Sequence, residues 1–198
     1  MSNETFYRYL TQPEERQLFR TVRAVDDALA KRDLAWMQLM RATGIRVGAL
    51  SRLTVADARQ ALAEGRLTIR GDINKRGKTH VVSLHSMGTR ALTQLLRIRA
   101  RQGHPADPAA PLIMSRQGGR GLSVRTYQER LRKWVLASGL GMQVTPHWFR
   151  HTLAKRMLDN STSPAKALGI VQRVLGHSDI NTTTVYTRPS REDIDRAL

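Results

Sequence analysis

Thr145-Pro-His-Trp-Phe-Arg-His151 is the most informative stretch of the sequence. Thr145 followed by Pro146 predicts a helix start, because threonine can cap a first turn and proline is favoured at its first position. His147 and Arg150 are three residues apart, so they share one face of that turn. The N–H groups at a helix start attract anions, and an arginine beside them can clamp a phosphate. The heptapeptide therefore indicates a phosphate site, and taken alone it equally fits a basic surface helix.

Two histidines in this stretch, His147 and His151, are four residues apart, a spacing that also occurs in metal-binding helices. The zinc-protease signature of that spacing needs a glutamate directly after the first histidine. Trp148 stands there, and no nearby carboxylate completes a ligand set, so we expect no metal. The positive end of the helix dipole disfavours imidazolium. We therefore expect His147 to be neutral and able to act as a base.

The chain has 198 residues, with 33 lysines and arginines against 16 acidic residues, a formal net charge of +17. The basic residues are spread along the whole length, which favours a polyanionic partner. A hydrophobic fraction of 40% fits a folded domain. No apolar run approaches the ~18 residues of a membrane helix, and the N-terminus lacks a secretory pattern. The absence of cysteine fits a reducing compartment. We expect a cytoplasmic protein without membrane contact.

The remaining pattern is mostly helical. Apolar spacing and capping residues predict a helix that starts after Thr11, and further helices near residues 33–43, 46–53, 91–96, 124–135, 146–158 and 165–175. Gly44 and Gly176 are placed to end two of these helices. Two short β-prone runs, 67–70 and 80–84, flank a basic segment and predict a hairpin. The expected fold is mainly α with a small antiparallel β-sheet (α+β), in a single domain over residues 1–198.

Three further segments carry residues that could act on a phosphate. Arg46 follows a helix stop in Thr43-Gly-Ile-Arg46, where it is either a phosphate clamp or a solvated surface residue. In Asn74-Lys-Arg-Gly-Lys78, at the expected hairpin tip, contact with a DNA backbone is the ordinary interpretation. His177 directly follows a helix cap, and Tyr186 comes nine residues later. Taken singly, such a tyrosine is far more often structural than nucleophilic.

Together these segments resemble the catalytic domain of the tyrosine recombinase (phage integrase) family. Thr43-Gly-Ile-Arg46 is similar to its first arginine box, the Thr145 heptapeptide to its second, and Leu-Gly-His177 with Tyr186-Thr to its third. Counting back from Val81-Val-Ser-Leu, which resembles the strand after the family's lysine, reaches Lys75, with Lys78 as the alternative. The resemblance covers about residues 8–190. The catalytic set that it implies is Arg46, Lys75, His147, Arg150, His177 and Tyr186.

The resemblance implies a site-specific recombinase that cleaves and rejoins DNA through a 3′-phosphotyrosyl intermediate. Tyr186 would attack the phosphodiester, with His147 as general base. The two arginines would clamp the phosphate, His177 would donate a hydrogen bond to it, and the hairpin lysine would protonate the leaving 5′-oxygen. The covalent link preserves the phosphodiester energy, so no ATP, metal or other cofactor is expected.

Two features depart from the family pattern. Ala49 stands where members commonly carry a glutamate, three residues after the first arginine. No helical core-binding domain precedes the catalytic one, so the chain resembles short, catalytic-domain-only members, or a piece trimmed from a longer protein. Candidates for further DNA contact are Arg76, Lys78, Arg125 and Arg132.

The partners that the resemblance implies are double-stranded DNA with paired recombination sites and further copies of the chain. A homo-tetramer would form on DNA from free monomers or dimers, in some systems with accessory DNA-bending proteins, in a bacterial, phage or plasmid context. The tail over residues 190–198 either docks on a neighbouring protomer or packs on its own domain. Two alternatives stay open: a relaxing enzyme of type IB topoisomerase style, and a DNA-binding regulator or architectural protein that retains the fold.

Overall fold

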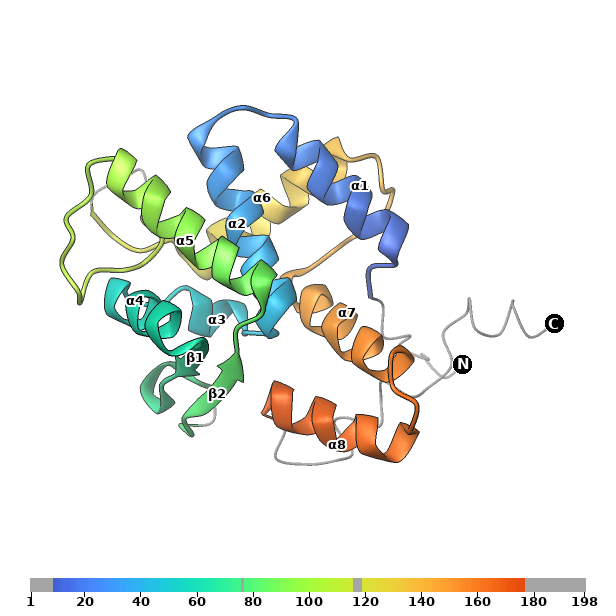
Figure 1. The fold of residues 1–198 in the computed structure, drawn as a ribbon. Helices are drawn as coiled ribbons and strands as arrows, with labels where there is room; N and C mark the ends of the chain where they lie inside the picture. The colour runs from blue at the N-terminus through green and yellow to red at the C-terminus, as the bar shows by residue number, and fades with distance from the viewer. Residues whose placement is uncertain (1–8, 76, 116–118, 177–198) are drawn as a thin grey trace.

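The computed structural model describes residues 9–75, 77–115 and 119–176 (Figure 1). The predicted class, mainly α with a small antiparallel sheet, is confirmed over these residues. In chain order the elements are α1 (Gln12–Arg23), α2 (Ala28–Thr43), α3 (Val47–Leu50), α4 (Val55–Glu64), β1 (Arg66–Ile69), the 3-10 helix η1 (Gly71–Ile73), β2 (His80–Ser83), α5 (Ser86–Arg101), α6 (Val124–Ala137), α7 (Pro146–Asp159) and α8 (Pro164–Leu175).

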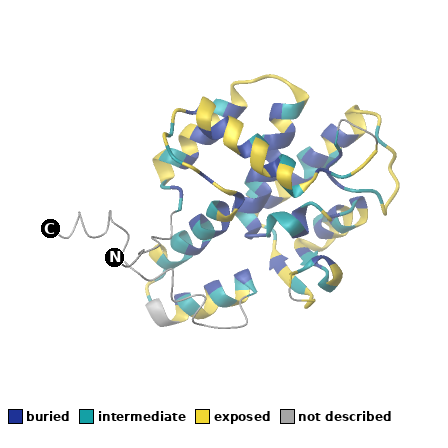
Figure 2. Ribbon diagram, turned by 180° about the vertical axis from the view of Figure 1, so that it is seen from behind, coloured by how far each residue is buried: buried dark blue, intermediate teal, exposed yellow. Residues whose placement is uncertain are grey.

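Helix α2 forms the centre of the molecule. Helices α1, α5 and α7 pack against it (Figure 1), and the buried residues gather along it (Figure 2). Its Trp36 is fully buried, with its ring centroid 5.1 Å from that of Tyr127 on α6 and 6.4 Å from that of Phe149 on α7. These edge-to-face contacts join three helices around one core.

Local capping signals explain where several helices begin and end. Thr11 and Glu14 form the predicted capping box of α1. Gly44 ends α2 and Gly176 ends α8, both in the left-handed conformation, at φ 64° and 62°. This conformation costs a residue with a Cβ more than it costs glycine. These three predictions are confirmed because each depends on a few consecutive residues.

The predicted start of α2 near Asp33 is wrong. The helix begins at Ala28, where the Asp27 carboxylate accepts a hydrogen bond from the Ala30 N–H at 2.7 Å. Asp33 lies inside the helix, fully buried, and its carboxylate accepts hydrogen bonds from four side chains on α2 and α6: Arg32, Trp36, Arg130 and Trp134. This carboxylate joins α2 to α6 and does not cap a helix.

Helix α4 was not predicted from the sequence, although its signals are present. Thr54 and Asp57 form a capping box, and Gly65 ends the helix at φ 66°. The helix packs on β1 and α5. It therefore supports the side of the sheet that faces the interior.

The predicted hairpin is confirmed. Strands β1 and β2 pair antiparallel, with Arg66 opposite Ser83 and Ile69 opposite His80. Leu67, Ile69 and Val82 are buried, so the sheet packs one face on the core. The described residues of its connection, 70–75 and 77–79, lie at the edge of the molecule (Figure 1). Within the described ranges, no helix is both long and apolar enough to span a membrane.

Candidate active site

Arg46 is placed by the sharp end of α2. The left-handed Gly44 reverses the chain, Ile45 enters the core, and Arg46 follows at the extended N-cap position of α3. Its Nη1 donates a hydrogen bond to the Asn74 Oδ1 at 3.5 Å. This bond connects the first arginine to the hairpin connection.

Arg150 lies in the first turns of α7, and only 5% of its surface is exposed. Its Nη1 donates to the Gly44 carbonyl at 2.6 Å, and its Nη2 donates to the Leu175 carbonyl. One guanidinium therefore joins the C-terminal ends of α2 and α8. The predicted helix start at Thr145 and Pro146 is confirmed, but the Thr145 side chain makes no capping hydrogen bond.

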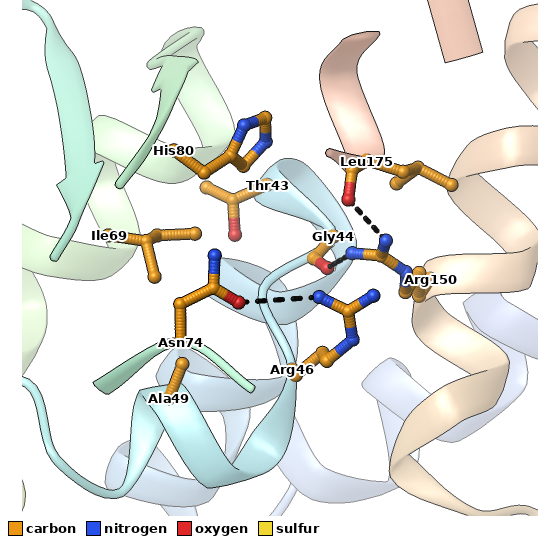
Figure 3. Close-up of a pocket in the computed structure, with 9 residues that line it drawn as sticks. All are labelled: Thr43, Gly44, Arg46, Ala49, Ile69, Asn74, His80, Arg150 and Leu175. Carbon is orange, nitrogen blue, oxygen red and sulfur yellow. Dashed lines mark hydrogen bonds between the residues drawn. The ribbon is translucent and has the colours of Figure 1, made fainter. Parts of the chain in front are cut away.

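The two arginines meet at one pocket (Figure 3). In that view the Arg46 and Arg150 guanidinium groups approach the pocket from different helices, while Asn74 and His80 reach it from the hairpin. No acidic residue is among the described residues that line it. The lining residues are Thr43, Gly44, Arg46, Ala49, Ile69, Asn74, His80, Arg150 and Leu175. Two guanidinium groups at one pocket favour an anion, and their planar donor geometry matches phosphate.

His147 lies one turn before Arg150 and reaches solvent. Desolvation by the surrounding protein, and then the positive charges of Arg150, Arg46 and Lys75, lower the pKa of His147 below its ordinary value. The imidazole is therefore neutral near pH ~7 and can accept a proton. The sequence predicted the same protonation state from the helix dipole, whereas desolvation and nearby cations are the causes found here.

His151 lies one turn beyond His147, and the two ring centroids are 6.3 Å apart. Burial, followed by the neighbouring His147 and Arg150, lowers the pKa of His151 to about 4. Across the part of the chain that the structure describes, no three or more acidic or histidine side chains cluster in a way that could hold a metal ion.

The hairpin connection carries the candidate lysines. Lys75 and Lys78 are both exposed. The Asn74 Nδ2 donates to the Lys78 carbonyl at 2.7 Å, so this asparagine ties the connection to Arg46. Ala49 is buried and lines the same pocket. Asn74 thus links the Arg46 guanidinium to the hairpin connection by hydrogen bonds, which the methyl side chain of Ala49 cannot form.

The predicted site residues fall into three groups. Arg46 and Arg150 meet at the pocket, and His147 and Lys75 are near enough for their charges to interact. Lys78, Arg125 and Arg132 are exposed on the hairpin connection and on α6, and Arg125 pairs with Glu129 at 2.8 Å. Three predicted residues lie outside the described ones: Arg76, His177 and Tyr186. Asn74 and His80 were not predicted as parts of the site, because nothing in their local pattern separates them from other polar hairpin residues.

A helical fold that brings two arginines to one pocket beside a basic hairpin is suited to binding a phosphate group. The model of the phage integrase family matches residues 8–193, and the chain belongs to this family. It is 35% identical over 162 residues to the tyrosine recombinase XerC of Vibrio campbellii, covering 82% of this chain and 48% of that protein. To the XerC of Haemophilus ducreyi it is 37% identical over 163 residues, covering 82% and 49%. The chain thus spans about half the length of these curated relatives.

Solved structures share the fold. The crystal structure of XerA recombinase superimposes with a TM-score of 0.78 and 25% identity, covering 97% of this chain and 64% of that one. The crystal structure of the XerH site-specific recombinase, bound to its difH substrate in a pre-cleavage complex, superimposes with a TM-score of 0.73 and 19% identity. The match covers 98% of this chain and 53% of that one. Because the XerH structure is only 19% identical to this chain, its similarity shows a shared fold and nothing more.

Proposed function

We propose that this chain is the catalytic domain of a tyrosine-type site-specific DNA recombinase, which cleaves and rejoins strands through a covalent 3′-phosphotyrosyl intermediate. The observation that carries this proposal is the pocket shared by Arg46 and Arg150. The family membership and the neutral His147 beside the pocket support it. We assign residues 1–198 to one catalytic domain.

The two arginines bind the scissile phosphate and stabilise the extra negative charge of its pentacoordinate transition state. The Gly44 and Leu175 carbonyls hold the Arg150 guanidinium in place before DNA arrives. A guanidinium that is already oriented reorganises little during the reaction, which favours the transition state over the bound ground state.

Proton transfers complete the reaction. A tyrosine phenol has a pKa of ~10, so Tyr186 needs a base to attack at neutral pH. His147 takes this proton and returns it on religation, because its neutral imidazole has an acceptor nitrogen. His177 donates a hydrogen bond to a phosphate oxygen. Lys75, exposed on the hairpin connection, protonates the departing 5′-oxygen.

The substrate is double-stranded DNA with paired recombination sites. The net charge of +17 favours such a polyanion, and two structures of the same fold, those of XerH and of the Tn1549 integrase, contain DNA. Exchanging four strands requires four active sites, so we propose a homo-tetramer on DNA. The reaction takes place in the cytoplasm, where such DNA lies.

The experiment that tests this proposal traps the covalent intermediate. DNA selected from a random pool by binding to the protein is nicked near the scissile position and incubated with the protein in EDTA. We expect a covalent adduct with the wild type and none with Tyr186→Phe. Tyr127→Phe is the matched control and should keep the adduct, because the Tyr127 ring is buried in the core and its hydroxyl makes no hydrogen bond among the described residues.

The alternatives give different results. No adduct on any selected DNA would leave a DNA-binding regulator or architectural protein, and an adduct that needs a metal would contradict the mechanism. A supercoiled plasmid with two copies of the selected site separates the enzymes: recombinant products support the proposal, and relaxation alone supports the topoisomerase alternative.

A further inference from the structure

The C-terminal end of α8 is held by side chains from two distant elements. The last carbonyls of a helix have no partner within the helix. Here the His80 Nε2 lies 2.7 Å from the Val174 carbonyl, and the Arg150 Nη2 donates to the Leu175 carbonyl. A carbonyl can only accept, so the His80 Nε2 carries the proton and donates. Residue 80 thus reaches a helix end that lies 94 residues later in the chain.

Gly176 allows the His80 ring to approach this closely. A Cβ at residue 176 would lie 3.1 Å from the ring Cγ and Nδ1 atoms, which is tighter than ordinary van der Waals contact. The glycine therefore has two reasons to lack a side chain: its left-handed φ of 62° and the imidazole against it. The ring packs on the point where α8 ends and the chain continues to residue 177.

His80 also belongs to the hairpin and to the pocket. It is the first residue of β2, so it stands at the base of the connection that carries Lys75. It lines the pocket that Arg46 and Arg150 share (Figure 3). Burial, followed by the charges of Arg150 and Arg46, lowers the pKa of His80 below its ordinary value, while its bond to the Val174 carbonyl acts in the opposite direction. The ring is therefore a neutral donor near pH ~7.

We propose that His80 is a positioning residue, which locks the hairpin that carries the lysine onto the end of α8 beside the two arginines. The proposal rests on the proposed function, in which the lysine, the arginines and the chain that leaves α8 act on one phosphate. Small displacements of reacting groups slow a chemical step strongly while substrate binding changes little. His80 should therefore affect the rate of strand cleavage more than the affinity for DNA.

The kinetic test compares His80→Ala, His80→Gln and His85→Ala. Glutamine keeps an N–H donor near the position of the imidazole Nε2, and alanine removes it. His85 is the matched control, because it is exposed five residues further along and its side chain makes no capping bond to α5. Adduct formation is followed in a single turnover on the nicked substrate, and DNA affinity is measured separately.

We expect His80→Ala to slow adduct formation about tenfold or more and to change the dissociation constant by less than about threefold. His80→Gln should recover most of the rate, and His85→Ala should match the wild type. A wild-type rate in His80→Ala, or a glutamine variant as slow as the alanine one, would overturn the proposal.

A measurement on the free protein separates this proposal from the proposed function. Proton–nitrogen spectra of histidine-labelled protein, with His80 assigned by its loss in His80→Gln, should show a slowly exchanging Nε2–H. A rapidly exchanging proton, or an Nδ1–H tautomer, would overturn the contact. If the wild type forms no adduct, the proposed function fails, and these spectra still decide whether His80 holds α8.

Discussion

At the scale of single residues, the pocket depends on backbone carbonyls as much as on side chains. Arg150 is oriented by Gly44 and Leu175, and both are carbonyls at helix ends. Such carbonyls carry the negative end of the helix dipole, which favours a cation. The two helix ends therefore orient a buried guanidinium through their carbonyls.

This arrangement predicts what loss of Arg150 does. Arg150→Ala should lower the single-turnover cleavage rate by ~10²-fold or more, because the lost donors act on charge that develops in the transition state. DNA affinity should change little by comparison. Arg97→Ala, an exposed arginine on α5, is the control. Equal losses of cleavage and binding in Arg150→Ala would reduce this residue to a DNA contact.

A second residue-scale prediction concerns acid stability. The pKa of His151 is lowered to about 4 in the folded chain and is ~6.5 in an unfolded one. Between these values the unfolded state binds more protons, so the free energy of unfolding falls as the pH falls from ~6.5 towards 4. We expect His151 to account for roughly 2 kcal/mol of this loss.

Urea unfolding at several pH values measures this effect. His151→Gln cannot be protonated in this range, so its stability should depend less on pH than that of the wild type. The comparison concerns the slopes and not the absolute stabilities, because the substitution also changes packing. Parallel curves for the two proteins would show that His151 does not carry the effect.

At the scale of elements, two helices next to the pocket end at glycines. Gly44 ends α2 just before Arg46, and Gly176 ends α8. Gly65 ends α4 with nearly the same φ, 66°, but a Cβ there would meet nothing within 4 Å. The caps of α4 and α8 thus share a backbone conformation and differ in their surroundings.

This difference can be measured with two alanine variants. Gly65→Ala should lower the free energy of unfolding by ~1 kcal/mol, the ordinary cost of a Cβ in left-handed backbone. Gly176→Ala should cost about 1 kcal/mol more, because its Cβ displaces the His80 ring. The extra cost should shrink in a His80→Ala background. Equal costs at the two glycines would contradict the close packing of the ring.

At the scale of the whole molecule, the proposed function divides the positive charge into two parts. Arg46 and Arg150 meet at the pocket, and we expect most of the other lysines and arginines to contribute to a general attraction for DNA. The buried ones have structural partners: Arg41 pairs with Glu15 at 2.6 Å, and Arg32 with Asp33 at 3.0 Å. The exposed lysines and arginines are therefore expected to account for much of the salt dependence of binding.

The salt dependence of DNA affinity tests whether an exposed basic residue contributes to this attraction. Each phosphate neutralised contributes about 0.9 to the slope of log K against log salt concentration. Lys78→Gln, at the hairpin, should reduce the slope by about one and weaken binding to selected and random DNA alike. Lys31→Gln is the control, because Lys31 lies at the start of α2 and pairs with Asp26. An unchanged slope in Lys78→Gln would remove this residue from the interface.

Features that depend on neighbouring residues can be predicted from the sequence alone. The Thr11 capping box, the left-handed Gly44 and Gly176, the hairpin strands and the start of α7 at Pro146 each follow from a few consecutive positions. Helix α4 carries signals of the same kind, so it too can be predicted from its sequence.

The partners of the buried polar groups, in contrast, depend on how distant elements pack together. Asp33 has the residue type of a helix cap, yet α6 packs against it and turns its carboxylate into a buried link between helices. Arg150 contacts a carbonyl 106 residues away, and His80 contacts one 94 residues away. A helix cap depends on neighbouring residues, so it can form wherever the helix lies. A contact across the fold exists only once both elements are packed together, so such pairs depend on how the helices pack.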